Sequence, residues 1–201
     1  MPLNIGIYVY DDVEVLDFAG PYEVFTTATR MHARNSRDDR QLFNVFTIGR
    51  STAPVRARAG LKVDPDFSIN DRPPVDCLIV PGGVVTAELE KPDVIHWISD
   101  QSEPGRVVAA VCTGAFLLAR TGKLAGKQVT THWEDIDDLK EMFPSVDVLS
   151  TLRWVDEGSF VTSAGISAGI DMSLHLVERL HSRELAERTA PQMDFDWTEN
   201  D

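Results

Sequence analysis

The sequence predicts an α/β fold in which helices cover both faces of a mostly parallel β-sheet. Two observations carry this prediction: short apolar runs rich in valine and isoleucine recur along the chain, and segments with a helical pattern alternate with them. A length of 201 residues is enough for one well-buried domain of this kind, so we expect residues 1–201 to form a single domain. The strand-like runs are NIGIYVY from residue 4, FNVFTI from residue 43, DCLIVPGG from residue 76 and RVVAAVC from residue 106.

The first helix is expected to start at Gly20 and Pro21, because proline is pre-organised for the first turn of a helix. It runs through YEVFTTATRM, and the polar stretch HARNSRDDRQ over residues 32–41 is then a loop or a frayed end. A proline pair within residues 64–76 and a Pro-Gly step within residues 99–106 interrupt any helix there. Both segments are therefore predicted to lead into the buried strands that follow them.

The second half of the chain continues with a helix after residue 112 that ends at TGK, followed by QVTTHW. A helix beginning near Glu134 is expected to stop by Pro144, and short strands are expected at RWV and SFVTS. The last helix begins near Ser167, and an apolar stripe along it contains Ile170, Leu174 and Val177.

Composition limits the partners and the cellular setting. The formal charge of -13 disfavours a nucleic-acid partner, because such a surface needs lysine and arginine to replace the counterions of the phosphates. No apolar stretch reaches the ~20 residues of a membrane-spanning helix, and no secretory leader precedes the first strand-like run. With only Cys77 and Cys112, a disulfide scaffold is not expected. We therefore expect a cytoplasmic protein without membrane contact.

Cys112 interrupts the apolar run VVAAVCTGAFLLAR where a strand gives way to a helix. The same strand–turn–helix arrangement exposes the nucleophile of hydrolases, and a helix amino end would lower the pKa of the thiol and favour the thiolate. A buried structural cysteine fits the pattern equally well, because free cysteine packs like a small hydrophobic residue. Cys77 lies inside DCLIV with no turn beside it, so we expect an inert core residue.

Asp17 and a glycine pair also have two interpretations each. Asp17 lies at the same predicted sheet edge as Cys112, where an apolar pocket beside the thiol would raise its pKa and let it donate a proton. A helix-capping or turn aspartate explains Asp17 as well. Gly82 and Gly83 follow a buried strand, where their N–H groups could approach a bound group or form a plain tight turn.

His132 and His175 also lie in patterns that have a functional and a structural interpretation. His132 and Glu134 match the H-x-E pattern of zinc deaminases, but the chain has no P-C-x-x-C partner, so no metal site is predicted. His175 lies one turn from Asp171 and from Glu178 along the last predicted helix, which indicates a solvated polar face.

Four segments, taken together and in this order, resemble the ThiJ/PfpI superfamily of class I glutamine-amidotransferase-like folds. They are VLDFAGPYEVF, LIVPGG, AVCTGAFLLARTGKLAGKQVTTHW and VTSAGISAGIDMSLHLVERL, and the resemblance runs from about residue 4 to about residue 193. It implies a flavodoxin-like three-layer sandwich with a strand, a nucleophile elbow and a helix. The aspartate at Asp17 and the Cys-Thr-Gly from Cys112 are similar to those of isocyanide hydratases and of the amidotransferase-like sensory domains of AraC-type regulators.

The resemblance implies a catalytic role for several residues. Cys112 would be the nucleophile, and Asp17 would protonate the intermediate that forms on it. Asp17 and Thr113 would steer the water. Gly83, which follows Gly82 in the turn, would join the amide of Thr113 in stabilising charge that develops on the intermediate.

The resemblance also places His132 and Ile166 near the sulfur. His132 would accept a proton, form a hydrogen bond or serve the structure alone, and Ile166 would help to shape the pocket. Thr113 stands where PfpI-type peptidases have a histidine, which argues against a peptidase triad. Family members often carry a further glycine two residues after the pair, whereas this chain has Val84-Val85-Thr86, and the loop over residues 84–88 matches no pattern.

These observations predict a cofactor-free enzyme that acts on a small molecule through Cys112. The leading hypothesis is an isocyanide hydratase, which converts R–N≡C and water to an N-substituted formamide through a thioimidate. A glyoxalase or deglycase-like enzyme is an alternative, although such members generally have glutamate at the position of Asp17. A non-catalytic ligand or redox sensor of the AraC type is another, but the acidic end MDFDWTEND leads us to expect no DNA-binding module. The resemblance implies a homodimer.

Overall fold

The computed structural model describes residues 1–36 and 41–200. Among the described helices, none combines the length and the apolar character needed to cross a lipid bilayer. The strands of the main sheet are β1 (Leu3–Tyr8), β2 (Phe43–Gly49), β5 (Phe67–Ser68), β6 (Cys77–Val80), β7 (Val107–Val111), β10 (Trp154–Asp156) and β11 (Phe160–Ser163).

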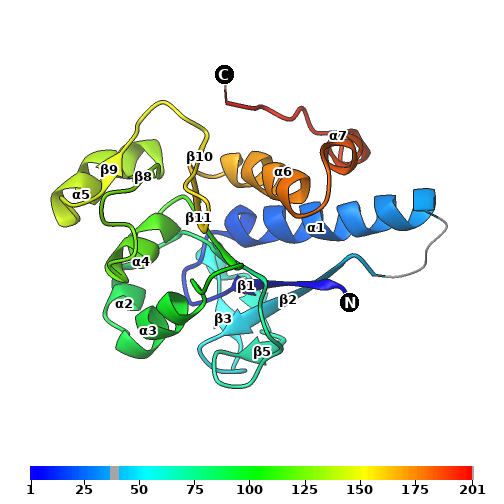
Figure 1. The fold of residues 1–201 in the computed structure, drawn as a ribbon. Coiled ribbons are helices and arrows are strands. Elements are labelled where there is room, and N and C mark those ends of the chain that lie inside the picture. The colour runs from blue at the N-terminus through cyan, green and yellow to red at the C-terminus, as the bar shows by residue number, and fades with distance from the viewer. Residues whose placement is uncertain (37–40, 201) are drawn as a thin grey trace.

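Within the described residues the main sheet has the strand order β10-β11-β7-β6-β1-β2-β5 (Figure 1). Neighbouring strands pair in parallel, except that β10 is antiparallel to β11. Counted in chain order, β1, β2, β6, β7 and β11 stand in the order 2-1-3-4-5, which is the flavodoxin-like order. This arrangement confirms the predicted fold class.

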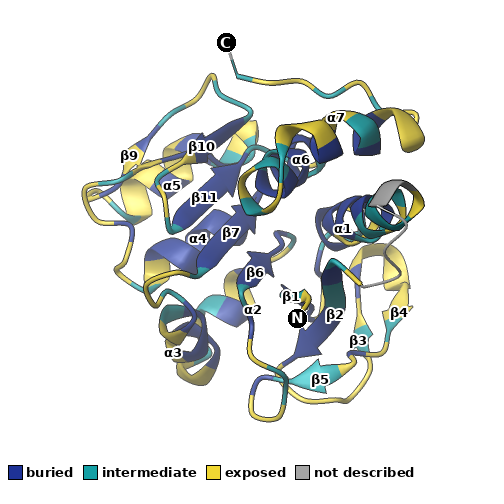
Figure 2. Ribbon diagram, turned by 45° about the vertical axis from the view of Figure 1, so that its right-hand side comes forward, coloured by how far each residue is buried: buried dark blue, intermediate teal, exposed yellow. Residues whose placement is uncertain are grey.

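Helices cover both faces of the sheet and complete the three layers. On one face lie α1 (Val15–Ser36), α6 (Ala168–Leu180) and α7 (Arg183–Gln192), and on the other lie α2 (Thr86–Leu89), α3 (Pro92–Asp100) and α4 (Gly114–Arg120) (Figure 1). Because both faces are covered, β6 and β7 are buried along their whole length, whereas the helices turn exposed faces to solvent (Figure 2).

Shorter elements surround the sheet edges. They are β3 (Val55–Arg56), η1 (Arg58–Gly60), β4 (Lys62–Val63), β8 (Gln128–Val129), η2 (Trp133–Asp135), α5 (Ile136–Met142) and β9 (Asp147–Val148). The strands β3 and β4 pair antiparallel, and β8 and β9 pair in parallel.

The predicted start of the first helix at Gly20 and Pro21 is wrong, because α1 already begins at Val15. Pro21 lies inside the helix, where its missing N–H removes one hydrogen bond at a typical cost of ~3 kcal/mol. Burial outweighs this cost: Val24 and Phe25 of α1 are completely buried. As a consequence, Asp17 lies in the first turn of α1 instead of in the loop before it.

Other boundaries also differ from the prediction. Within the polar stretch at residues 32–41, α1 continues to Ser36, and residues 37–40 lie outside the described residues. The segment at residues 84–88 contains most of α2, and the helix α7 was not predicted. Ser182 caps α7 by accepting a hydrogen bond from the N–H of Leu185 at 3.3 Å, a local signal that the apolar pattern did not reveal.

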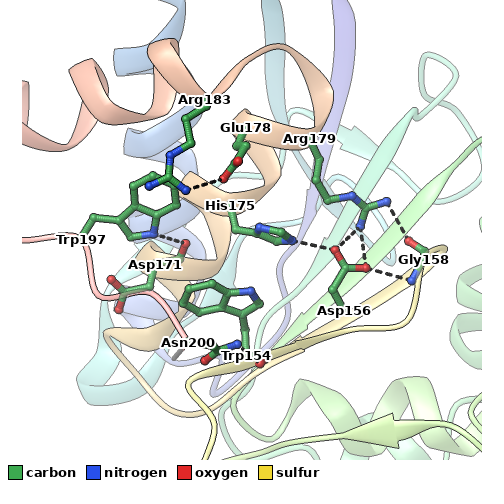
Figure 3. Close-up of polar contacts among 10 residues, drawn as sticks. All are labelled: Trp154, Asp156, Gly158, Asp171, His175, Glu178, Arg179, Arg183, Trp197 and Asn200. Carbon is green, nitrogen blue, oxygen red and sulfur yellow. Dashed lines mark hydrogen bonds and ion pairs between the residues drawn. The ribbon is translucent and has the colours of Figure 1, made fainter.

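The C-terminal segment returns to α6 after α7 (Figure 3). The indole Nε1 of Trp197 donates to the Asp171 carbonyl at 3.2 Å, and the backbone N–H of Thr198 donates to Asp171 Oδ1 at 2.8 Å. Arg183 forms an ion pair with Glu199 at 2.6 Å. These bonds attach the last described residues to α6 and α7.

The predicted solvated face around His175 is also wrong. Its Nε2 lies 2.6 Å from Asp156 Oδ2 on β10, and its ring stacks on Trp154 with 5.5 Å between centroids (Figure 3). The partner of His175 therefore comes from the neighbouring strand and not from the acidic residues of its own helix. A contact between residues 19 positions apart could not be derived from helical spacing.

Candidate active site

Cys112 lies in the sharp connection between β7, which ends at Val111, and α4, which begins at Gly114. Its φ of 56° is in the left-handed region, which residues other than glycine rarely adopt. Two hydrogen bonds hold this conformation: the Cys112 N–H donates to the Ser163 carbonyl on β11 at 3.1 Å, and Thr131 Oγ1, in the segment after β8, donates to the Cys112 carbonyl at 2.8 Å. Strain held in this way is typical of a nucleophile elbow.

The small residue after the elbow allows the turn to pack tightly. A Cβ added at Gly114 would lie 2.1 Å from the carbonyl oxygen of Val80 at the end of β6. Only glycine permits this approach, so the sequence Cys-Thr-Gly fixes where the thiol emerges relative to β6.

Asp17 is the buried carboxyl group beside the thiol. It has no exposed surface, and its Oδ2 accepts a hydrogen bond from the Gly82 N–H at 3.0 Å. Burial raises the pKa of Asp17 to about 7, while the Gly82 N–H and the Cys112 thiol lower it in part. Oδ1 is buried and has no hydrogen-bond partner in the part of the chain that the structure describes. A carboxyl group of this kind can hold or release a proton at neutral pH.

The thiol of Cys112 is not acidic, which contradicts the lowered pKa expected from the helix amino end. Burial, together with the negative charge of Asp17, raises the pKa of Cys112 to about 12. The amide and hydroxyl of Thr113 act in the opposite direction but do not outweigh burial. A thiol with this pKa is protonated at neutral pH.

The glycine pair and Thr113 are joined to one another. Thr113 Oγ1 accepts a hydrogen bond from the Gly83 N–H and donates one to the Gly83 carbonyl, both at 2.9 Å. The Gly82 N–H is occupied by Asp17. The Thr113 backbone N–H interacts with the sulfur. Charge stabilisation by the Gly83 N–H stays a prediction, because that N–H is bonded to Thr113 Oγ1 and would first have to break this bond.

These groups meet at the carboxyl edge of the sheet where the strand order reverses. Asp17 follows β1, Gly82 and Gly83 follow β6, and Cys112 follows β7. Connections from β1 and β6 leave toward opposite faces of the sheet, and such a point is where open α/β sheets bind ligands.

A cavity of about 230 Å³, here called the thiol cavity, opens over the sulfur. The structure brings most of the predicted site residues to its wall: Gly83, Cys112, Thr113, His132 and Ile166. The remaining two, Asp17 and Gly82, lie behind that wall, where they bond to each other. The cavity can therefore hold a small reacting group against Cys112.

His132 caps a short helix at the mouth of the thiol cavity. Its Nδ1 accepts a hydrogen bond from the Glu134 N–H at 3.3 Å, and Asp135 Oδ2 lies 3.3 Å from the same nitrogen. No group of three or more His, Cys, Asp or Glu side chains suited to a metal ion is present among the described residues. The H-x-E pattern thus corresponds to a helix cap.

Several residues of the cavity wall or beside it were not found from the sequence, among them Asp135. Glu14 and Arg58 line the thiol cavity and form an ion pair at 3.0 Å, although they are 44 residues apart in the chain. A Cβ added at Gly165 would lie 2.2 Å from His132 Cδ2 and 3.0 Å from Cys112 Sγ, so this glycine leaves room at the sulfur. The glycine-rich SAGISAG segment contained a signal for Gly165, whereas nothing local pointed to the ion pair.

Comparison with known proteins yields relatives of more than one functional kind, among them transcriptional regulators and enzymes. The chain is 34% identical over 185 residues to the HTH-type transcriptional regulator GbdR of Pseudomonas aeruginosa, which covers 92% of this chain and 48% of that protein. The chain thus spans about half the length of this relative. It is 33% identical over 196 residues to the isonitrile hydratase of Pseudomonas putida, covering 97% of this chain and 79% of that enzyme.

Fold and family comparisons agree with each other. The crystal structure of a ThiJ/PfpI family protein from Pseudomonas syringae matches with a TM-score of 0.84 and 25% identity, covering 98% of this chain and 76% of that one. The model of the DJ-1/PfpI family matches residues 4–179. These matches confirm the resemblance inferred from the four sequence segments.

Proposed function

The chain belongs to the DJ-1/PfpI family, and on that premise we propose that it is an isocyanide hydratase that uses Cys112 as its nucleophile. The observation that carries the proposal is the pairing of a protonated thiol at a strained elbow with a buried carboxyl group whose pKa is about 7. The isonitrile hydratase relative supports this choice of substrate, since isonitrile is another name for isocyanide. The reaction as proposed needs no cofactor.

The first half of the reaction joins the thiol to the terminal carbon of R–N≡C. As the sulfur attacks, the Asp17 carboxylate, which interacts with the Cys112 thiol, accepts the thiol proton. Asp17 then delivers this proton to the attacked carbon, which gives the thioimidate R–N=CH–S-Cys112. A carboxyl group with a pKa near neutrality is suited to both transfers.

The second half adds water and releases the product. Asp17 accepts a proton from water while the water oxygen bonds to the thioimidate carbon, and the same proton moves on to the nitrogen. The C–S bond of the resulting R–NH–CH(OH)–S-Cys112 then breaks, and the hydroxyl proton returns to the sulfur. The products are R–NH–CHO and the free thiol, so atoms and charges balance.

Thr113 supports this chemistry in two ways. Its backbone N–H interacts with the sulfur, where it stabilises the negative charge that grows as the thiol loses its proton. Its hydroxyl holds the Gly83 turn in place, and that turn connects to the Gly82 N–H on Asp17. Thr113 therefore fixes the carboxyl group and the thiol relative to each other.

The test is formamide production from alkyl and aryl isocyanides by the purified protein. Turnover that requires Cys112 is the expected result. Lactate formation from methylglyoxal, measured in parallel, would favour the glyoxalase-like alternative. Absence of turnover on several isocyanides would contradict the hydratase.

A ligand sensor is the second candidate, because the 34% identity to GbdR is as high as that to the hydratase. In this case the thiol cavity would bind a small molecule without turning it over. Saturable binding of an isocyanide or carbonyl compound with no product after long incubation would favour this function. For either function we propose a cytoplasmic homodimer, as the family resemblance implies.

A further inference from the structure

A second, larger cavity adjoins the thiol cavity. This arm cavity, as it is called below, has a volume of about 640 Å³ and lies among α2, α4 and α5, which neighbour one another in Figure 1. Gly83, Thr113 and Asp135 line both cavities, so the two spaces meet beside the elbow. A molecule that reacts at Cys112 can therefore extend its remaining atoms into the arm cavity.

One wall of the arm cavity is apolar. It is formed by Val84, Val85, Leu89, Phe116 and Met142. Val84 and Met142 are 48% and 53% exposed, so large apolar surface faces the opening. Covering that surface with an apolar group is favourable by about 25 cal/mol per Å². The wall thus favours a hydrocarbon or aromatic arm over a polar one.

The facing wall is acidic. Asp135, Asp138 and Glu141 follow one another at intervals of three residues, which places them on one side of α5 and the turn before it. In the described part of the chain, neither Asp138 nor Glu141 forms an ion pair with lysine or arginine. Burial raises the pKa of Asp135, and the charge of Asp138 contributes to the same shift. Asp138 and Glu141 therefore carry negative charge that no lysine or arginine among the described residues pairs with, whereas Asp135 lies 3.3 Å from His132.

Helix stability explains only part of this charge. Asp138 lies in the first turn of α5, where the helix dipole favours an anion. Glu141 is the residue before the last one of the helix, where the dipole disfavours an anion. Unlike Asp138, Glu141 therefore gains nothing from the helix dipole, and on the cavity wall it can attract a bound cation.

We propose that the arm cavity determines substrate choice by binding an apolar arm that ends in a cationic group. This inference rests on the proposed reaction at Cys112 and specifies its substrate class. The apolar wall holds the arm, and Asp138 and Glu141 attract the positive end. An anionic arm of the same size is repelled, and a compound as small as methylglyoxal has no arm to occupy the space.

The test uses three aryl isocyanides that differ only in the para substituent: trimethylammonium, tert-butyl and carboxylate. The first two have nearly the same shape, so their difference reports charge alone. We expect kcat/KM for the cationic compound to exceed that for the neutral one by about three- to tenfold. This is the size of effect expected when two carboxylates attract a cation at a partly solvated site. The carboxylate compound should be the poorest substrate.

Variants identify the source of the preference. Asp138→Asn together with Glu141→Gln should reduce the cationic advantage to within about twofold. Asp137→Asn is the matched control, because Asp137 has the same charge and helix but is 97% exposed in its side chain and faces Lys140 at 3.8 Å. The control should keep the wild-type preference. Equal kcat/KM for all three compounds in wild type would overturn the proposal.

A second readout separates this inference from the hydratase itself. The same three para-substituted rings are attached to chloroacetamide, and alkylation of Cys112 is followed by peptide mass spectrometry. The same order of rates without isocyanide turnover would sustain the arm cavity and reject the hydratase. Isocyanide turnover with no dependence on arm charge in either assay would support the hydratase and reject the role of the arm cavity. If no reagent labels Cys112, both the hydratase and the arm cavity are rejected.

Discussion

Cys77 lies on β6 and Cys112 directly follows the neighbouring parallel strand β7, yet the surroundings of the two thiols differ. Both are buried, with exposures of 0% and 7%, and burial raises the pKa of each to about 12. Neither burial nor thiol acidity therefore distinguishes the two residues.

The difference lies in what surrounds each sulfur. Cys77 is the first residue of β6 and packs within the core. Cys112 stands one residue past the end of β7, in a left-handed conformation, beside Asp17 and at the wall of the thiol cavity. Under the proposed reaction, position at the carboxyl edge and a proton acceptor beside the thiol, rather than an acidic thiol, would make Cys112 the reactive cysteine.

The largest expected effect is the loss of activity in Cys112→Ala. Because the covalent intermediate cannot form, kcat/KM for isocyanide hydration should fall by at least about 1,000-fold. Cys77→Ala is the matched control and should stay within about twofold of wild type, since Cys77 touches no reacting atom. Equal losses in both variants would remove the distinction between the two thiols.

The next effect concerns Asp17, the proposed acceptor of the Cys112 thiol proton. The thiol proton can move to Asp17 only when the carboxyl group is ionised, so kcat/KM should rise with pH through about 7 and then level off. Asp17→Asn should lower kcat/KM about 100- to 1,000-fold and abolish this rise. A wild-type profile that is flat from pH 5 to pH 9 would contradict the assignment of Asp17 as the proton acceptor.

The stability of the protein should also depend on Asp17. Its pKa is about 7 in the folded state against 3.8 for the ordinary group, so the folded state binds more protons between these values and stability falls as pH rises through them. The lost stability is about 4 kcal/mol above pH 7, since each unit of pKa shift corresponds to about 1.36 kcal/mol. Asp17→Asn should therefore gain stability over wild type at pH 8 but little at pH 4, as measured by urea unfolding. A gain that is the same at both pH values would count against a raised pKa.

The smallest expected effect tests the space at the sulfur. In Gly165→Ala the new Cβ collides with His132 and approaches Cys112 Sγ, so kcat/KM should drop about tenfold while the fold is retained. Gly20→Ala is the steric control, because its Cβ would also make a tight contact, 3.0 Å from Ile170 Cγ1, at a position that does not line the thiol cavity. If Gly165→Ala reacts as fast as wild type, that glycine does not shape the site.

Much of the fold could be predicted from local pattern. Buried parallel strands are continuous apolar runs, which is why β1, β2, β6 and β7 were found close to their observed positions. The elbow at Cys112 was visible for the same reason, as the point where one apolar element ends and another begins. Pro21 misled the prediction because its local preference was overruled by the burial of α1.

The parts that could not be predicted depend on contacts between distant residues. The acidity of Cys112 was misjudged because the sequence does not show that Asp17 and burial act on it together. The ion pair of Glu14 with Arg58 and the bond of His175 to Asp156 likewise join separate elements. Even the roles of Gly82 and Gly83 depend on hydrogen bonds that the strand-end pattern does not specify.

The measurement that tests the central claim most directly is mass spectrometry of the protein quenched with acid during turnover of an aryl isocyanide. The account predicts an adduct with the mass of one isocyanide on the peptide that contains Cys112, formed and consumed fast enough to account for the formamide. The peptide that contains Cys77 should stay unmodified. Formamide production at full rate with no adduct on Cys112, or with an adduct on Cys77 instead, would contradict the account.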